Sequence, residues 1–456
     1  KKTFLKPLHG TTEFCGTCHK VHLPEELNGY KWLRGQNHYD SFLLSGVSGH
    51  GVSSFYYPGV AEESCNECHM PTMVSDDFGA RVRDESGLTK TLDHLFPSAN
   101  TAVSQIAVDY GHVTQEQADA AVARHREFNE GVMRLDIFCI REEGAIDGEL
   151  VAPLRPAVPA LEPGKTYLLE VVVRTVKMGH EFTQGTADSN QVWLDVAAEH
   201  GGELIGRSGG MEPRDGSVDP WSHFLGAFVL DRDGYRVARR NAEDIFTPLY
   251  NHGIPPGAAD VIHYRLEVPA DAHGSVTFEA RLRYRKFDTE YMRFVMDDPA
   301  YANDLPILEL ASDAITFPIV GSEAAEAEAP EIPEWQRWND YGIGLLRKRG
   351  TGQLRQAEVA FQRVENLGRP DGPINLARVY LREGRVARDA PDALRRAAAF
   401  DPPAREWSVL WFTGLVNKQN GNFDAAIANF EQIVEGGFAQ AKGRGFDFSK
   451  DYRLLV

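Results

Sequence analysis

Hydrophobic and polar residues alternate in the middle of the chain, between Met133 and about Phe317. Four runs follow this pattern most clearly, namely TYLLEVVVRTV, QVWLDVAAE, VIHYRLEV and VTFEARLRYRKF, and clusters of Gly, Pro and Asp separate such runs. A period of two is typical of antiparallel strands with one buried face. Several such strands in succession predict an antiparallel β-sandwich over residues 132–320.

From Trp335 onward the spacing of apolar residues is helical and repeats roughly every 32–37 residues, close to the 34 of a tetratricopeptide repeat. Small residues recur where paired helices would have to approach each other. The expected contacts are Gly344 with Ala357 and Phe361, and Gly414 with Ala426 and Phe430. This pattern predicts an α-helical tetratricopeptide-repeat domain over residues 335–456, which follows an acidic, Pro-containing linker at 321–334.

Residues 1 to about 110, the larger part of a region predicted over 1–131, show little long apolar periodicity and are rich in His, Gly, Tyr and Ser. We expect such a stretch to pack around prosthetic groups rather than around its own side chains. Near the end of the region, Thr114 and Gln117 form the capping-box pattern of a helix start, and Ala118 and Val122 share one apolar stripe. They predict one helix over residues 114–129. The chain as a whole is thus predicted to be a multidomain α+β protein.

Composition and charge narrow the function. The 456 residues are 42% hydrophobic and 25% charged, and no apolar run is long enough to cross a bilayer, so we expect a protein that does not span a membrane. With 48 basic and 66 acidic residues, the formal net charge is -18. A charge of this sign argues against nucleic acid as a partner and favours a basic redox partner protein.

Four of the five cysteines lie in two pentapeptides, Cys15-Gly-Thr-Cys18-His19 and Cys65-Asn-Glu-Cys68-His69. In Cys-x-x-Cys-His, the two thiols bind haem covalently and the His becomes the proximal ligand of the iron. Two Cys-x-x-Cys pairs would also suit a four-thiolate zinc site, but zinc does not require a His after the second Cys, and here it occurs twice. The sequence therefore predicts two covalently attached c-type haems.

The distal face of each iron either binds a second protein ligand or stays open. A second His there gives an electron carrier, whereas an open position permits ligand binding or catalysis. The first candidates are His38 and His94, and the further candidates are His9, His50 and His180. They lie in unusual contexts, such as the Gly-rimmed loop KMGHEFTQG around His180. A β-turn histidine is the alternative interpretation for His180.

Nearby aromatic residues are candidates for packing against a porphyrin or for an ordinary core, namely Trp32, Phe42, Phe55, Tyr56 and Tyr57. Cys139, in the strand-like run LDIFCIREE, is expected to be a buried small hydrophobic residue. No phosphate-binding glycine loop, Ser-His-Asp signature or HExxH motif is present, so enzyme chemistry would have to come from the haem. We assign no catalytic side chain.

The stretch CGTCHKVHLPEELNGYKWLRGQNHYDSFLLSGVSGHG, followed by CNECHMP, resembles the multihaem c-type cytochromes that carry C-terminal tetratricopeptide repeats. The later segments HLFPSAN, GHEFTQG and WNDYGIGLL fit the same group. The resemblance implies an electron-transfer protein of the periplasm, the extracellular space or the cell surface, with mostly bis-histidine haems. Relatives usually carry more than two haem motifs, so we expect further haems in chain that precedes this sequence.

Three functions stay open at this point. The first is an electron relay in which the two haems belong to a longer chain of haems, continued across subunits of a homo-oligomer or filament, with the repeats as docking surface. The second is a multihaem oxidoreductase that acts on a small nitrogen or sulfur oxyanion at an open haem. The third is an assembly scaffold with structural haem. The haem motifs favour the relay, and an electron carrier over an enzyme.

Overall fold

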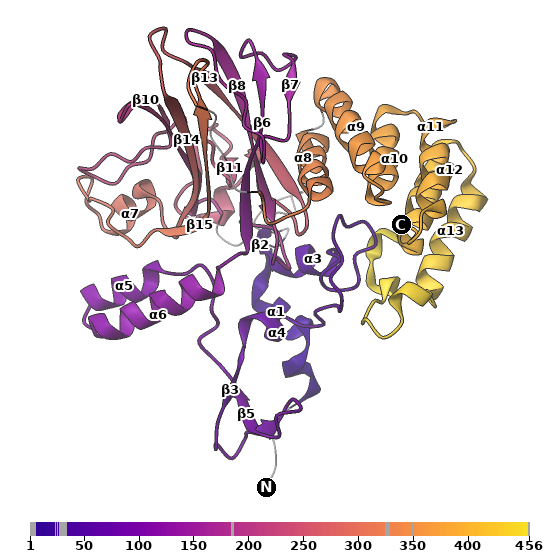
Figure 1. Cartoon of the computed structure of the whole chain (residues 1–456). Coiled ribbons are helices and arrows are strands. Elements are labelled where there is room, and N and C mark those ends of the chain that lie inside the picture. Colours follow the sequence, from indigo (N-terminus) through magenta and orange to yellow (C-terminus); the bar gives the residue numbers. More distant parts are fainter. Residues whose placement is uncertain are drawn as a thin grey trace.

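The structure is a computed structural model that describes residues 6–22, 24, 26, 34–183, 187–323, 329–348 and 350–454. Helices and antiparallel sheets occupy separate parts of these residues, which makes the chain a multidomain α+β protein (Figure 1). Trp32 and residues 324–328 of the expected linker lie outside the described residues. None of the described helices is long and apolar enough to cross a membrane.

Short elements make up the N-terminal part, which lies below the large sheets in Figure 1. They are η1 (Pro7–Gly10), α1 (Thr12–His19), β1 (Lys20–His22), β2 (Arg34–Asn37), α3 (His38–Leu43), α4 (Cys65–His69), β3 (Thr72–Val74), β4 (Arg81–Val82) and β5 (Thr89–Leu92). α1 buries only Thr12 and α4 buries no residue. These two helices therefore have no apolar core of their own.

The helix expected over residues 114–129 is confirmed as α6 (Gln115–Phe128), which packs beside α5 (Ala102–Asp109). Both halves of the capping box are present: the Gln117 N–H donates to Thr114 Oγ1, and the Thr114 N–H donates to Gln117 Oε1 at 2.9 Å. A capping box satisfies two backbone donors that a helix start leaves free. Ala118 and Val122 are buried, as the apolar stripe predicts.

Two four-stranded antiparallel sheets form the middle of the chain, and all four expected runs are strands. One sheet has the order β13-β8-β6-β7, from β13 (Ala259–Glu267), β8 (Thr166–Thr175), β6 (Met133–Glu142) and β7 (Leu150–Val151). The other has the order β10-β9-β14-β15, from β10 (Glu203–Ser208), β9 (Gln191–His200), β14 (Ser275–Arg285) and β15 (Leu308–Pro318). The pair β11 (Ala227–Leu230) and β12 (Thr247–Asn251), with η2 (Ala242–Asp244) and α7 (Thr289–Val295), completes this part.

The buried faces of the two sheets belong to one hydrophobic core, which includes Ile137 and Val171 from one sheet and Leu194 and Leu282 from the other. β14 alternates between buried and half-buried residues, as one covered face requires. β8 does not, because nine of its ten residues are buried. A strand covered on both faces loses the alternation, and the second cover of this sheet is helical.

Six helices follow the sheets and form the C-terminal part, on the right of Figure 1. They are α8 (Glu334–Lys348), α9 (Thr351–Asn366), α10 (Asp371–Glu383), α11 (Asp389–Ala399), α12 (Glu406–Gln419) and α13 (Phe423–Glu435), followed by η3 (Ala439–Ala441), η4 (Phe448–Lys450) and η5 (Tyr452–Leu454). Consecutive helices contact each other. A Cβ on Gly414 would lie 2.4 Å from Phe430, so α12 and α13 approach where expected.

The expected contact of Gly344 is wrong, and its actual neighbour explains the buried strands. A Cβ on Gly344 would lie 2.6 Å from Cγ2 of Val261 in β13, whereas Gly342 faces the Phe361 ring. The periodicity of a helix does not say which of its two small residues faces a second helix and which faces a sheet. Gly344 therefore lets α8 lie directly on the sheet.

Buried ion pairs fix α8 to the same sheet. Arg337 binds Asp136 of β6 at 2.8 Å, and Asp340 binds Arg174 of β8 at 2.7 Å and also Arg134. Breaking one partner of a buried pair leaves an uncompensated charge, at a cost of about 3–5 kcal/mol. The helical part is thus attached firmly to the sheets.

The end of the chain packs against the loop that joins α3 to α4. The Val52 N–H donates to Asp451 Oδ2 at 2.9 Å, and Arg444 donates to the carbonyl oxygens of Pro58 and Gly59 at 2.7 and 2.6 Å. Tyr57 is buried against Trp407 at 5.4 Å between ring centroids. The N-terminal and C-terminal parts are therefore in direct contact.

Candidate functional site

Both pentapeptides are helical in the structure. Cys15, Cys18 and His19 lie at the end of α1, and Cys65, Cys68 and His69 form the corresponding positions of α4. Residues at positions i, i+3 and i+4 share one face of a helix, so the two thiols and the imidazole of each motif point to the same side. All four thiols are free. This is the donor arrangement that covalent haem attachment needs.

The two motif helices lie next to each other. Thr12 Oγ1 donates to the carbonyl oxygen of Glu63 at 3.1 Å, and Asn66 Nδ2 donates to the carbonyl oxygen of His9 at 3.2 Å. Burial raises the pKa of the Cys65 thiol to about 12, and the neighbouring Cys15 thiol adds to this rise. Two groups attached to these helices would consequently lie close together.

Four imidazoles form a continuous series of ring contacts, which we call the histidine cluster. The ring centroids of His19 and His38 are 5.2 Å apart, those of His38 and His180 are 5.0 Å apart, and those of His180 and His69 are 6.2 Å apart. The last two rings are nearly parallel, at 13°. Each haem-motif histidine thus has one other histidine beside it.

The packing of α3 on α1 places His38 beside His19. A Cβ on Gly16 would lie 2.8 Å from the Tyr39 ring, so only Gly gives that ring room at this point of α1. Lys20, directly after His19, binds Asp40 at 2.8 Å. His38 is the first residue of α3, and these two contacts hold its helix end against the end of α1.

The loop after β8 brings His180 into the cluster from the sheets. The Glu181 N–H donates to Ser41 Oγ of α3 at 2.6 Å. A Cβ on Gly179 would lie 3.1 Å from the ring of Phe42, so the small residue permits a close approach of the loop to α3. The contact between this loop and α3 therefore holds His180 of the loop next to His38 of α3.

Backbone carbonyls set the orientation of two imidazoles. Nδ1 of His69 lies 2.8 Å from the carbonyl oxygen of Pro97, and Nδ1 of His180 lies 3.1 Å from that of Glu181. A carbonyl oxygen only accepts, so in both rings Nδ1 is the donor and Nε2 is left with its lone pair. This is the usual arrangement of a metal-ligating histidine.

Helix α6 holds the Pro97 carbonyl in place. The Ser98 N–H donates to Nδ1 of His125 at 3.0 Å, and Asn129 Nδ2 donates to the Ser98 carbonyl at 2.9 Å. The Phe128 ring lies 5.3 Å from that of His69. Sequence reasoning missed these supporting residues, because a helix face that contacts a distant loop has no local signal.

Burial lowers the pKa of three of the four imidazoles, those of His38, His69 and His180, and so favours their neutral form. Burial lowers the pKa of His38 to about 3, and His180, His19 and His69 add to this fall. Burial lowers the pKa of His180 to about 4, against the hydrogen bond to Glu181. Nδ1 of His38 is buried without a hydrogen-bond partner among the described residues. Neutral imidazole is the form that binds a metal ion, so the chemistry of the cluster suits a metalloporphyrin.

The spacing of the rings can be set by two imidazoles that bind opposite sides of one metal ion. Metal–imidazole bonds of about 2.0–2.1 Å place the ring centroids of two opposed ligands roughly 6 Å apart. The 6.2 Å between His69 and His180 agrees with this, and the 5.2 Å between His19 and His38 is shorter. Among the described residues, no three His, Cys, Asp or Glu side chains converge as a metal site of their own.

The other candidate histidines lie apart from the cluster. His9 and His94 are exposed, and Nδ1 of His94 contacts the carbonyl oxygen of Leu92 at 2.9 Å. Nδ1 of His50 contacts the carbonyl oxygen of Asp447 at 2.6 Å. The structure thus favours His180 over His94 as the partner of a motif histidine, while His9, His50 and His94 stay predictions.

The aromatic candidates divide between the two ends of the loop after α3. Phe42 lies beside Gly179, next to the cluster. Phe55 and Tyr57 instead contact the helical part, Phe55 under the guanidinium of Arg378 at 4.2 Å. They form ordinary core contacts there. Cys139 is fully buried in β6, as expected, with its thiol 3.2 Å from Glu170.

Comparison with known proteins adds little to this geometry. No family model matches the chain, and no curated protein matches it. Among solved structures, a penta-heme cytochrome c552 from Thermochromatium tepidum aligns with a TM-score of 0.38 and 14% identity over 67% of this chain. The alignment spans 56% of that chain. A similarity of this size does not establish a common fold, so the site rests on its own residues.

Proposed function

We propose that this protein is a c-type cytochrome that transfers electrons through two covalently attached haems. One observation carries the proposal: two helical Cys-x-x-Cys-His motifs lie side by side, and each motif histidine has a second histidine next to it. Histidine side chains on both faces of a bound haem would leave its iron no free coordination position, and the haem would supply one-electron chemistry. The relay therefore explains the cluster better than an open catalytic site does.

The roles follow from the positions of the side chains. Cys15, Cys18 and His19 would hold one haem, and Cys65, Cys68 and His69 would hold the other. His38 lies beside His19 and His180 beside His69, so these two would supply the second histidine of each haem. The carbonyl groups of Pro97 and Glu181 keep Nε2 of His69 and His180 free to bind iron.

The rest of the chain supports and presents this site. We propose that the two sheets form a β-sandwich (residues 132–320) that supplies His180, and that α8 to α13 are three tetratricopeptide repeats (335–456) joined to it through the linker at 321–334. The repeats would dock redox partners or further copies of the chain, so that haems of neighbouring subunits form one conducting series. Haem attachment of this kind fits a periplasmic, extracellular or cell-surface location.

Intact mass of the natural protein tests the haem count. We expect a mass above that of the polypeptide by two haems, plus any haems in chain beyond this sequence. The double variant Cys65→Ser/Cys68→Ser should lose one haem, and the control Cys139→Ala should lose none, because Cys139 lies in the sheet. A polypeptide that carries zinc and no covalent haem would overturn the proposal.

A further inference from the structure

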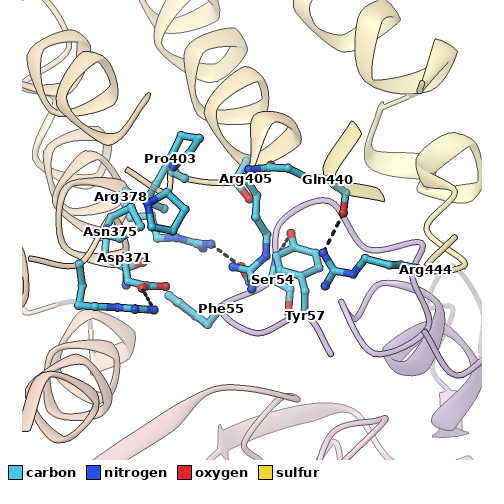
Figure 2. A pocket seen from close by; sticks show the side chains of 16 residues that line it. Ser54, Phe55, Tyr57, Asp371, Asn375, Arg378, Pro403, Arg405, Gln440 and Arg444 are labelled. Atoms are coloured by element: carbon cyan, nitrogen blue, oxygen red, sulfur yellow. Dashed lines mark hydrogen bonds and ion pairs between the residues drawn. The ribbon is translucent and has the colours of Figure 1, made fainter. Parts of the chain in front are cut away.

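A cavity of about 310 Å³ lies between the loop after α3 and the helical part (Figure 2). The loop contributes Ser54 to one wall, α10 contributes Asn375 to another, and the segment before α12 contributes Pro403. No member of the histidine cluster lines it. The cavity therefore belongs to a different site from the one described above.

The lining is strongly cationic, although the chain as a whole is acidic. Four arginines line the cavity, namely Arg369, Arg378, Arg405 and Arg444, against one acidic residue, Asp371. Asp371 is already paired with Arg369 at 3.4 Å. The guanidinium of Arg444 donates to the carbonyl oxygens of Pro58, Gly59 and Gln440. Arg378 and Arg405 are therefore the two arginines of the lining that could donate hydrogen bonds to a ligand.

Arg378 is held in place without a counter-ion. One terminal nitrogen donates to the carbonyl oxygen of Ser54 at 2.7 Å, and the guanidinium lies between the rings of Phe55 and Phe412, at 4.2 and 4.4 Å. Its Nε is buried and has no hydrogen-bond partner among the described residues. Removal from water makes such an unpaired donor costly, and this cost favours any anion that can fill the space.

Arg405 lines the same cavity as Arg378. Its guanidinium lies over the Tyr57 ring at 4.9 Å, and Figure 2 shows it extending from the start of α12 toward Ser54. Asp371, the one acidic residue of the lining, is paired with Arg369. Two guanidinium groups, each a rigid fork of N–H donors, thus line a cavity whose one carboxylate is already paired with another arginine.

We propose that this cavity binds a small organic carboxylate, which Arg378 and Arg405 hold through paired hydrogen bonds. A guanidinium matches the planar geometry of a carboxylate better than that of a single-atom anion. The volume is at the lower end of that of ligand pockets, and Phe55 and Pro403 offer apolar surface for the carbon part of the ligand. The carboxylate belongs either to a free small molecule or to the end of a peptide chain.

Titration calorimetry on the full-length holoprotein at low ionic strength separates these sources. The probes are succinate, a tripeptide with a free terminal carboxylate, and the same tripeptide amidated. Binding of succinate assigns a free carboxylate, whereas binding of the free tripeptide alone assigns a chain end. The absence of binding by all probes at roughly 10 mM would overturn the proposal, because charge-assisted hydrogen bonds from two guanidinium groups should give tighter binding than that.

Arg405→Gln should weaken binding of the effective probe at least about tenfold, since one charge-assisted pair is lost. Arg388→Gln is the matched control, because it removes the same charge from a side chain that is 87% exposed on the neighbouring helix. Arg405→Lys keeps the positive charge but lacks the paired N–H donors of a guanidinium, so it should recover only part of the affinity. It replaces Arg405→Gln in the test if that variant does not fold. Equal effects of Arg405→Gln and Arg388→Gln, or no effect of either, would contradict a built site.

Discussion

The imidazoles of His69 and His180 lie nearly parallel, 6.2 Å apart, although one belongs to α4 and the other to the loop after β8. The Ser41 hydroxyl of α3 holds the His180 loop, and the Pro97 carbonyl holds His69. The sheets therefore contribute a side chain to a site whose attachment motifs lie in the N-terminal part. Haem binding and the fold of the sheets depend on each other in this account.

Replacement of His180 tests this dependence directly. His180→Ala should leave both haems covalently attached, because the thiols are untouched, and should convert one of them from low spin to high spin. Electronic absorption and magnetic resonance spectra of the oxidised protein measure the spin state. His273→Ala is the control, since His273 is exposed and lies far along the chain in a turn before β14. An unchanged spectrum of His180→Ala would rule His180 out as a ligand.

The sequence alone predicts both His38 and His94 as ligands, whereas the structure favours only His38. Both belong to the N-terminal part, His38 at the start of α3 and His94 in a loop, but only His38 contacts a motif histidine. His38→Ala is expected to make one haem high spin, and His94→Ala is expected to leave both haems low spin. The opposite result would mean that the histidine cluster is not the ligand set.

Because of Glu170, the free energy of unfolding should depend on pH in the acid range. Burial alone would raise its pKa, but His263 and Arg141 outweigh burial and lower the pKa to about 2, from 4.5. A carboxyl group whose pKa is lower in the folded than in the unfolded protein stabilises the fold. Its full contribution is present above the unfolded pKa of 4.5 and is lost as the pH falls toward the folded pKa of about 2. The shift corresponds to roughly 3 kcal/mol.

Glu170→Gln should therefore lower the free energy of unfolding at pH 7 by about 3 kcal/mol, and the difference from the native protein should shrink below pH 4.5. Denaturant unfolding at several pH values measures it. Glu199→Gln, at an exposed position of β9, is the control and should change stability by less than about 0.5 kcal/mol. A difference that grows toward acid pH would contradict the assigned direction.

Gly344 tests the contact between α8 and the sheet. Gly344→Ala would place a Cβ 2.6 Å from Val261, and we expect a loss of about 1–3 kcal/mol in the free energy of unfolding through overpacking. Gly352→Ala in α9 meets no atom within 4 Å and should raise stability by up to about 1 kcal/mol, because Ala favours helix. Equal effects in both variants would mean that α8 does not pack closely on β13.

Much of the fold could be predicted from local patterns. The four alternating runs are strands, and the Thr114 capping box starts α6, because both signals depend on neighbouring residues only. The contact of Gly344 could not be predicted, since helical spacing does not identify the partner surface. For the same reason, the sequence did not show that β8 is buried on both faces.

The candidate site shows the same division. The attachment motifs are local and are visible in the sequence, so Cys15, Cys65 and their neighbours could be named at once. Pairing of His69 with His180 depends on the Ser41 hydrogen bond and the close approach at Gly179, which are contacts between distant segments. No spacing in the sequence distinguishes His180 from His94.

The reduced and oxidised absorption spectra of the intact holoprotein, recorded with and without carbon monoxide, test the central claim most directly. Bis-histidine ligation predicts two six-coordinate low-spin haems in both redox states, and a reduced spectrum that carbon monoxide leaves unchanged, because no coordination position is free. A high-spin band together with a shift on addition of carbon monoxide would contradict the relay and would point to an open haem site.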